Sequence, residues 1–344
     1  MNDPPMENGS SSTPFVHLHN HSEYSVLDGM CRIEDMVQRA VEYGMEALAL
    51  TDHGNLFGAI PFYQACQRRG VIPVIGCEMY VAKGSRFAKE PSQKDRHHLV
   101  LLCADETGYR NLIKLSSLAH TEGFYYRPRI DKELLRQYSN GLIGLSACLS
   151  GEVPQLLLND DYDGAKRAAG WYAELFGREG YYLELAYHGL EKELKVNRGL
   201  LSLARELELD VVATNDCHYL DHSDHRAHEV LLCIQTQKTF ADDDRMRFPS
   251  DQFYFKSPRE MEKVFGELPQ ALAASAQIAH RCRLVLELER KGGKLPSYPV
   301  PEGLDEGSYL RKLVLEKLSE RCPGCDARYT QRVEEELSII NAMQ

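Results

Sequence analysis

The 344-residue chain lacks several features that would assign it to a common class of protein. It has no run of about 18 apolar residues, which excludes a membrane-spanning helix. The first residues, MNDPPMENGSSSTP, have no basic start and no apolar core. They are therefore not a secretory signal, and a cytoplasmic location is expected. No glycine-rich dinucleotide or phosphate loop follows a predicted strand, which excludes the usual sheet-edge nucleotide folds.

Positive charge is also scarce. The formal net charge is -11, from 40 lysines and arginines against 51 aspartates and glutamates. Tight binding of duplex DNA needs a basic face that neutralises phosphates. The chain alone is therefore a poor candidate for such binding. An acidic site that meets nucleic acid presented by another protein stays open.

Ten cysteines occur at irregular spacing. In the absence of an export signal, reduced thiols are expected, and most are predicted to be small buried apolar side chains. Cys322 and Cys325 form a single C-x-x-C pair without a second pair, which favours a turn over a zinc knuckle.

Short apolar runs rich in β-forming residues alternate with helical patterns. Strands are predicted at Phe15–His19, Ala47–Asp52, Ile72–Val81, Leu99–Ala104, Leu142–Ala147, Tyr182–Ala186 and Val211–Asn215. Helices are predicted at Ile33–Tyr43, Leu56–Arg69, Tyr109–His120 and Glu191–Leu207. Seven strands alternating with helices are typical of a parallel α/β architecture. A closed or nearly closed barrel is favoured, with an open sheet as the alternative that periodicity does not separate.

The character of the chain changes after about residue 285. Residues 1–14 are predicted to be a disordered tail and residues 15–285 the barrel domain. The segment that starts at Lys291 and runs to Pro301 is rich in proline and glycine, which is typical of a linker. Two charged helical stretches follow, Tyr309–Glu320 and Arg332–Met343, so residues 286–344 are interpreted as a linker and the opening of a further domain.

The strongest local signal is the run His17-Leu-His-Asn-His21. On an extended strand, residues two apart share one face, so these histidines could point the same way. Imidazole nitrogens suit zinc and its neighbours in the divalent series. The alternative is a polar strand end with incidental histidines, and the H-x-H pattern alone does not decide between them.

Further side chains with metal-binding atoms fall at or near the ends of other predicted strands. They are Asp28, His53, Glu78, His98, Cys148, Asp216 and His218. Most lie at carboxyl ends, where α/β barrels keep their chemistry, whereas His98 lies at a strand start. With His19 and His21 they make nine candidate ligands, which is more than one ion needs and enough for two or three ions that share bridging carboxylates.

Several motifs that contain these residues resemble those of the polymerase and histidinol phosphatase (PHP) superfamily. More narrowly, the chain resembles the N-terminal PHP domains of bacterial DNA polymerase III alpha subunits. The segments that carry this resemblance are Phe15–Gly29, Ala49–Ala59, Glu122–Asp131, Ser146–Pro154, Ala213–Leu220 and, for the start of a polymerase palm, Arg332–Met343.

The resemblance implies a distorted seven-stranded (β/α) barrel with a trinuclear metal site. It implies that His19, His21 and Asp216 hold one ion, that Glu78, His98 and Cys148 hold a second with Glu78 bridging to the first, and that Asp28, His53 and His218 hold a third. His19, Glu78 and Asp216 would act in catalysis through water at the metal. The Cys148 thiolate favours zinc, with manganese, iron or magnesium as alternatives. His17 is expected to orient a ligand from behind.

The implied activity is metal-dependent 3′–5′ exonuclease proofreading, within a DNA-directed DNA polymerase whose nucleotidyltransferase site would lie beyond Gln344. Expected partners are a DNA 3′ end, the remainder of the alpha subunit and other replicase subunits, with no membrane. Tyr125, Tyr126, Arg127 and Arg129 form an aromatic-basic run that could contact DNA; a surface turn is the alternative. Two other functions stay open: a metal-binding scaffold without catalysis, and a phosphatase for small monoesters.

Overall fold

The computed structural model describes residues 13–91, 95–288 and 298–343. The chain divides into two compact units between Leu286 and Glu287. Most of the tail predicted at 1–14 and most of the linker predicted from Lys291 to Pro301 lie outside the described residues. No helix among the described residues is long and apolar enough to cross a membrane.

The described part of the first unit contains a curled sheet of seven strands. These are β1 (Ala47–Leu50), β2 (Ile72–Ala82), β3 (Arg96–Cys103), β4 (Arg129–Ile130), β5 (Leu142–Leu145), β6 (Tyr181–Leu185) and β7 (Val211–Ala213). Their order is β1-β2-β3-β5-β6-β7, and β4 pairs with β2. The expectation of an all-parallel sheet is wrong for β3, which runs antiparallel to both β2 and β5.

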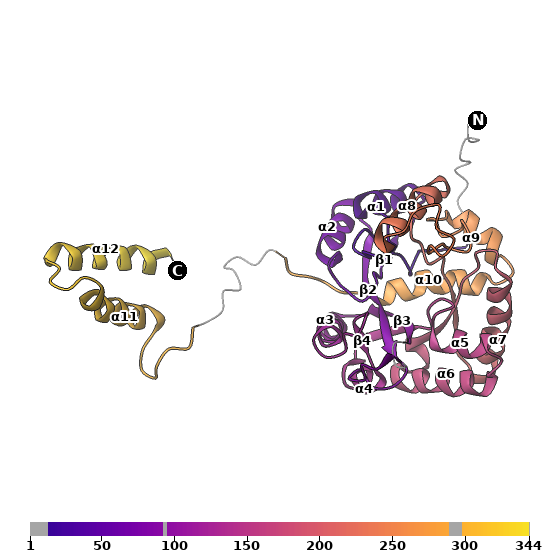
Figure 1. Ribbon diagram of the computed structural model, residues 1–344, viewed down its shortest axis with the longest axis horizontal. Helices are drawn as coiled ribbons and strands as arrows, with labels where there is room; N and C mark the ends of the chain where they lie inside the picture. Colours follow the sequence, from indigo (N-terminus) through magenta and orange to yellow (C-terminus); the bar gives the residue numbers. More distant parts are fainter. Residues whose placement is uncertain (1–12, 92–94, 289–297, 344) are drawn as a thin grey trace. The chain divides into compact units, whose positions relative to one another are not determined.

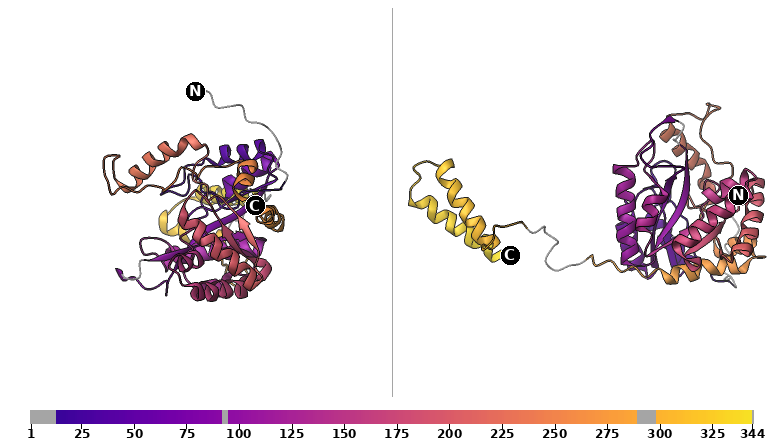
Figure 2. Two further views of the ribbon diagram at one scale, coloured as in Figure 1. Left: turned by 90° about the vertical axis from the view of Figure 1, so that its right-hand side faces the viewer. Right: turned by 90° about the horizontal axis from the view of Figure 1, so that it is seen from below.

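Helices surround this sheet (Figures 1 and 2). They are α1 (Ile33–Glu42), α2 (Ala59–Arg69), α3 (Glu106–Thr121), α4 (Lys132–Tyr138), α5 (Glu152–Leu158), α6 (Tyr162–Phe176), α7 (Glu191–Leu207), α8 (His225–Thr236), α9 (Pro258–Phe265) and α10 (Pro269–Arg281). Several begin at capping side chains. Asp105 accepts a hydrogen bond from Gly108 at the start of α3, and Ser257 and Glu260 form a capping box on α9.

The predicted strand at Phe15–His19 is not a strand. The segment nevertheless lies between the first and last strands of the order, joined to each by backbone hydrogen bonds. His17 O accepts from Ala49 N of β1 at 3.0 Å, and His19 O accepts from Cys217 N, just after β7, at 3.1 Å. An irregular segment thus closes the curled sheet, and it brings His19 and His21 into the interior.

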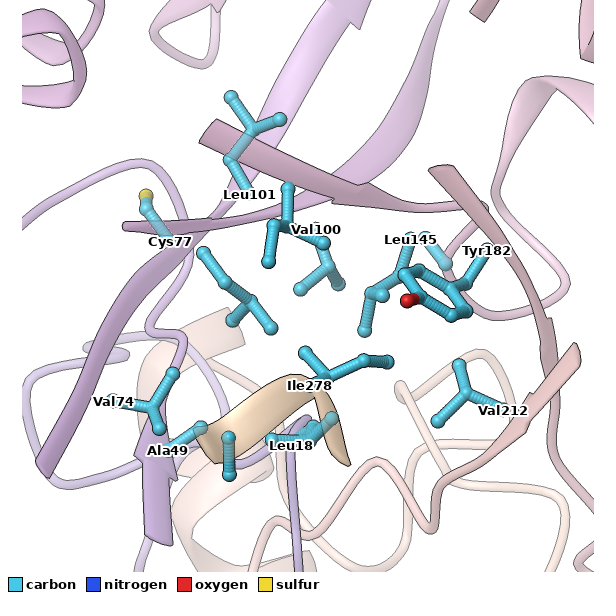
Figure 3. Packing of buried hydrophobic residues seen from close by; sticks show 14 of the residues in the cluster. Leu18, Ala49, Val74, Cys77, Val100, Leu101, Leu145, Tyr182, Val212 and Ile278 are labelled. Carbon is cyan, nitrogen blue, oxygen red and sulfur yellow. The ribbon is translucent and has the colours of Figure 1, made fainter. Parts of the chain in front are cut away.

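The hydrophobic core fills the space enclosed by the sheet and α10 (Figure 3). Val100 of β3, Leu145 of β5 and Ile278 of α10 are among its buried side chains. Burial of such aliphatic side chains stabilises the fold by roughly 1.5–3 kcal/mol each. Leu18, directly before the candidate ligand His19, packs into the same core, which fixes the position of the closing segment.

The second unit contains the helices α11 (Glu306–Arg321) and α12 (Ala327–Met343), which confirms the helical character predicted for both stretches. Arg311 pairs with Glu334 across the two helices. Leu337 is the single buried hydrophobic residue among the described residues of this unit. Cys325 N donates to Cys322 O at 3.1 Å, so the C-x-x-C pair occupies a turn between the helices, as predicted.

Candidate metal centre

The nine predicted ligands lie together at one edge of the sheet. His53 follows β1, Glu78 lies on β2, Cys148 follows β5, and Asp216 and His218 follow β7. His98 stands near the start of β3, which its predicted position left unexplained. Because β3 is antiparallel, its beginning lies at the same edge as the carboxyl ends of its parallel neighbours.

Glu78 is the central acid of this cluster and is almost fully buried. Its Oε1 accepts a hydrogen bond from His98 Nδ1 at 2.8 Å. Its Oε2 lies 2.7 Å from His53 Nδ1 and 3.4 Å from His21 Nε2. His19 Nε2 is 3.5 Å from Oε1. One carboxylate therefore faces four imidazoles, which is an arrangement that suits a bridging ligand.

Asp216, which follows β7, faces two of the same histidines. Its Oδ1 lies 3.1 Å from His21 Nε2 and 3.3 Å from His19 Nε2. The backbone of Asp216 is left-handed, with φ of 44°, a conformation that costs a residue with a Cβ of order 1–3 kcal/mol. Ala147, just before Cys148, is also left-handed. Such backbone strain persists where the surrounding structure fixes a side chain in place.

The remaining three ligands complete the edge. The rings of His21 and His218 stack with centroids 4.3 Å apart. Asp28 Oδ2 lies 3.5 Å from His53 Nε2. Cys148 Sγ lies 3.8 Å from Glu78 Oε1. Each of the nine side chains thus contacts at least one other member of the set.

Several buried polar atoms in this cluster lie close to one another but make no hydrogen bond of proper geometry. Among the described residues they include His19 Nε2, His21 Nε2, Asp28 Oδ1, His53 Nδ1, Glu78 Oε2 and Asp216 Oδ1. A buried polar atom without a partner is costly, and so many converging on one place need an explanation. Divalent cations among them would satisfy these nitrogen and oxygen atoms.

The ligand atoms also converge closely enough to share ions. Within the part of the chain that the structure describes, three sets of three offer ligand atoms within 4.8 Å of one another: His19, His21 and Glu78; His53, Glu78 and His98; and His21, His53 and His218. The sets overlap at Glu78, His21 and His53. The donor set therefore fits divalent metal binding, with three residues shared between the sets.

The electrostatics of the cluster are strongly polarised. Burial alone would lower the pKa of His19, but Asp216, Glu184 and Glu78 raise it well above its ordinary value. Burial alone would raise the pKa of Asp216, but the nearby charges of His19 and His218 outweigh burial and hold this pKa well below its ordinary value. Burial lowers the pKa of His21 to about 3. The cluster therefore favours ionised carboxylates, which would attract a divalent cation.

Glu184 is a functional candidate that the sequence analysis missed. Its Oε1 accepts hydrogen bonds from His19 Nδ1 and from Thr214 Oγ1, both at 2.6 Å. The carboxylate therefore fixes the ring so that Nε2 faces the cluster, as acids behind metal-binding histidines do. The available signal was an acid in the middle of the apolar run Tyr-Tyr-Leu-Glu-Leu of β6.

Two further side chains support the ligands from behind. Ser25 Oγ accepts from His53 N at 2.9 Å and lies 2.8 Å from His21 Nδ1. His228 of α8 bonds the backbone carbonyl of Asp28 through Nε2 at 2.7 Å. These contacts limit how far the ligands can move, because the supporting groups are themselves buried.

The expectation that His17 orients a ligand is wrong. Its Nε2 donates to the carbonyl of Lys256 at 2.7 Å, and its Nδ1 lies 3.5 Å from Cys217 Sγ. The irregular backbone after Leu18 breaks the strand alternation, so His17 faces Phe255 while His19 and His21 face the cluster.

The aromatic-basic run divides into two parts. Tyr126 is 68% exposed and its ring meets that of Tyr125 edge-on at 4.7 Å. Arg129 is buried on β4 and donates to the carbonyls of Gly123 and Ala88, at 3.1 and 2.8 Å. Arg129 therefore stabilises the loop, and its predicted contact with DNA is wrong. Contact of Arg127 with DNA stays a prediction.

The sequence comparisons agree with this geometry. The family described as PHP domain matches residues 17–188, half of the chain. The chain belongs to the PHP domain family. This PHP chain is similar to curated proteins named DNA polymerase III subunit alpha. It is 42% identical to that of Borreliella burgdorferi over 332 residues, 96% of this chain and 29% of the relative.

Two further relatives of the same name give similar values. The Chlamydia trachomatis protein is 44% identical over 356 residues, which cover 92% of this chain and 28% of the relative. The Thermus aquaticus protein is 43% identical over 322 residues, which cover 91% of this chain and 26% of the relative. The chain therefore spans less than a third of the length of these relatives. A solved two-domain protein from Bacteroides vulgatus, containing a predicted PHP-like metal-dependent phosphoesterase, is 13% identical with a TM-score of 0.39, over 77% of this chain and 63% of that protein.

Proposed function

We propose that this chain is the PHP module of a bacterial DNA polymerase III alpha subunit and that it hydrolyses DNA from the 3′ end. The observation that carries the proposal is the cluster of buried ligand atoms around Glu78 and Asp216 that make no hydrogen bond. The similarity to DNA polymerase III alpha subunits supplies the substrate, because a replicative polymerase meets DNA 3′ ends.

Two or three divalent ions would be held by the nine ligands. His19, His21 and Asp216 would hold one, and Glu78, His98 and Cys148 a second, with Glu78 reaching both. Asp28, His53 and His218 would hold a third. The thiolate and imidazole ligands favour zinc, with manganese, iron or magnesium as alternatives. Burial together with Asp216 and Glu78 raises the pKa of the Cys148 thiol well above its ordinary value, so ion binding must displace its proton.

When bound, clustered divalent ions make water more nucleophilic and offset charge on the phosphate and the leaving oxygen. In the reaction, a water oxygen bonds to phosphorus and the bond from phosphorus to the 3′ oxygen of the preceding nucleotide breaks. Asp216, Glu78 and His19 line the place where this happens. Glu184 keeps the His19 ring oriented, and the left-handed backbone at Asp216 aims its carboxylate inward.

The acidic chain needs help to reach its substrate. With a net charge of -11, it offers little general attraction for a DNA backbone. The remainder of the alpha subunit would deliver the 3′ end, and other replicase subunits are further partners. A replication protein of this kind would work in the cytoplasm.

A direct test uses metal-loaded protein and single-stranded DNA labelled at its 3′ end. The proposal predicts metal-dependent release of the labelled nucleotide, abolished by a chelator and restored by manganese or zinc. Cleavage of small phosphate monoesters without cleavage of DNA would favour a phosphatase. Metal-loaded protein that cleaves neither substrate, alone or in a longer chain that continues past Gln344, would favour a metal-binding scaffold.

A further inference from the structure

The ten cysteines differ in how accessible their thiols are. Seven of them are buried, and Cys148 belongs to the candidate metal centre. The remaining two, Cys322 and Cys325, are both partly exposed. A buried thiol reacts slowly because reagents do not reach it. Cys322 and Cys325 are therefore the accessible thiols of the chain outside the candidate ligands.

These two cysteines are the first and fourth residues of the turn between α11 and α12. Cys325 N donates a hydrogen bond to Cys322 O at 3.1 Å. Pro323 and Gly324 occupy the two central positions, and φ of Gly324 is 78°. Proline at the first central position and glycine with positive φ at the second are typical of a type II β-turn.

The turn holds the two cysteines at the separation that a disulfide needs. The first and fourth Cα atoms of a β-turn lie within about 7 Å of each other, and a disulfide joins Cα atoms about 4.4–6.8 Å apart. The ring of Pro323 fixes its own φ, and Gly324 adopts its left-handed conformation without strain. Closing a disulfide here therefore orders little more backbone, which favours one internal bond over two separate adducts.

The same turn is joined to both helices by backbone hydrogen bonds. Cys322 N donates to Leu318 O of α11 at 2.9 Å, and Tyr329 N of α12 donates to Asp326 O at 3.1 Å. Leu337 is the single buried hydrophobic residue among the described residues of this unit. Small units with little core gain much of their stability from cross-links. A disulfide across the turn would therefore stabilise the hairpin of α11 and α12.

The surroundings of the pair suit slow, reversible oxidation more than redox catalysis. Partial burial and the neighbouring Cys325 raise the pKa of the Cys322 thiol, and Asp326 acts in the same direction. The thiolate is the form that attacks a disulfide, so a raised pKa slows the exchange at neutral pH.

We propose that Cys322 and Cys325 form a reversible disulfide by exchange with a small disulfide, and that this bond stabilises the α11–α12 hairpin. One cysteine thiolate attacks the small disulfide, whose S–S bond breaks and releases one small thiol. The other cysteine then attacks the protein sulfur of the mixed disulfide and releases the second small thiol. The cysteines lose two electrons and two protons, and the small disulfide gains both. This inference does not depend on the proposed hydrolysis of DNA.

The test follows the two thiols in the metal-loaded full chain. Protein is equilibrated with mixtures of oxidised and reduced glutathione, quenched with acid, alkylated with iodoacetamide and digested with trypsin. The tryptic peptide 322–328 contains these two cysteines and no other. In wild type it should lose the mass of two hydrogen atoms and carry no alkyl group, and dithiothreitol should reverse the change. In Cys322→Ser and Cys325→Ser it should instead carry one glutathione.

Gly324→Ala tests the contribution of the turn. No atom lies within 4 Å of a Cβ added at Gly324, so the substitution acts through the strained φ alone. The closed ring cannot relax as the open chain can, and the internal disulfide should therefore lose about tenfold in equilibrium constant against the mixed disulfide. Gly303→Ala is the matched control, because Gly303 in the same unit also has positive φ and open surroundings. It should behave as wild type does.

Hydrogen exchange measures the effect on the hairpin. Amides of α11 and α12 should exchange about tenfold more slowly in oxidised than in reduced wild type, and equally in Cys322→Ser treated in the same two ways. Equal exchange in the two forms of wild type would overturn the stabilising role. Unmodified thiols or two glutathione adducts in wild type would overturn the disulfide. So would an extra equivalent of zinc that wild type holds and both serine variants lose, since it would assign the pair to a metal ion.

Discussion

The carboxylate of Glu184 accepts a hydrogen bond of 2.6 Å from Nδ1 of His19, although 165 positions separate the two residues along the chain. Both side chains are completely shielded from solvent. The contact joins the closing segment to β6 and turns His19 Nε2 toward Glu78 and Asp216. The geometry of the centre thus depends on residues behind the ligands as much as on the ligands themselves.

Substitution of Glu184 should therefore weaken metal binding without removing a ligand. Glu184→Gln keeps the size of the side chain but loses the charge that holds the His19 N–H. We expect metal affinity to fall by about 10- to 100-fold, measured by competition with a chromophoric chelator. Glu206→Gln, which loses an exposed pair with Lys166, is the matched control. Equal affinity in the two variants would contradict the orienting role.

Metal content tests the number of ions. Because nine ligands exceed the need of one ion, elemental analysis of protein purified without chelator should give about two to three equivalents, with zinc or manganese foremost. One equivalent or none in well-folded protein would contradict a multinuclear centre.

Chelation tests whether the ions stabilise the fold. The ligands come from the closing segment and from the ends of β1, β5 and β7, so bound ions tie separate parts of the sheet together. Because ions that bind only the folded chain stabilise it, their removal should lower the melting temperature, and their return should restore it. An unchanged melting curve after verified metal removal would show that the centre does not stabilise the sheet.

Acid should destabilise the fold through His228. Burial lowers its pKa from 6.5 to about 4 while it bonds the carbonyl of Asp28. Below pH 6.5 the unfolded chain takes up a proton that the folded chain refuses until about pH 4, so stability falls as the pH drops through this window. At pH 5 this amounts to about 2 kcal/mol for one such histidine.

His228→Gln isolates this contribution, because glutamine can still donate to the carbonyl but does not titrate. Between pH 7 and pH 5 in chelator, the free energy of unfolding of the variant should fall by about 2 kcal/mol less than that of wild type. His225→Gln, on the exposed side of the same helix, should behave as wild type does. Parallel pH profiles for wild type and His228→Gln would contradict this role.

Strand periodicity and ligand chemistry predicted most of the strands and the nine ligands. Three residues show what these patterns do not predict. His98 looked misplaced because strand direction depends on pairing partners, which local pattern does not encode. Glu184 was missed because an acid within an apolar strand is recognised only when its partner, His19, is known. Arg129 looked accessible because a motif reports composition and not burial, and its donors serve backbone carbonyls.

The segment at residues 15–19 shows the same limit on a larger scale. Its alternation predicted a strand, but its backbone hydrogen bonds to β1 and to the loop after β7 form no regular ladder with either neighbour. Tertiary contacts outweighed the local pattern and left His17 on the far side from His19.

The most direct test of the account compares wild type with Asp216→Asn on single-stranded DNA bearing a 3′ mismatch, with added manganese or zinc. The substitution keeps the size of the side chain but removes the charge that balances a divalent cation. Asp221→Asn, an exposed aspartate that pairs with Arg39, is the control. The account predicts that wild type and Asp221→Asn release the terminal nucleotide, while Asp216→Asn, still folded, is slower by about two orders of magnitude or more. A near wild-type rate in Asp216→Asn would show that this centre does not perform the hydrolysis.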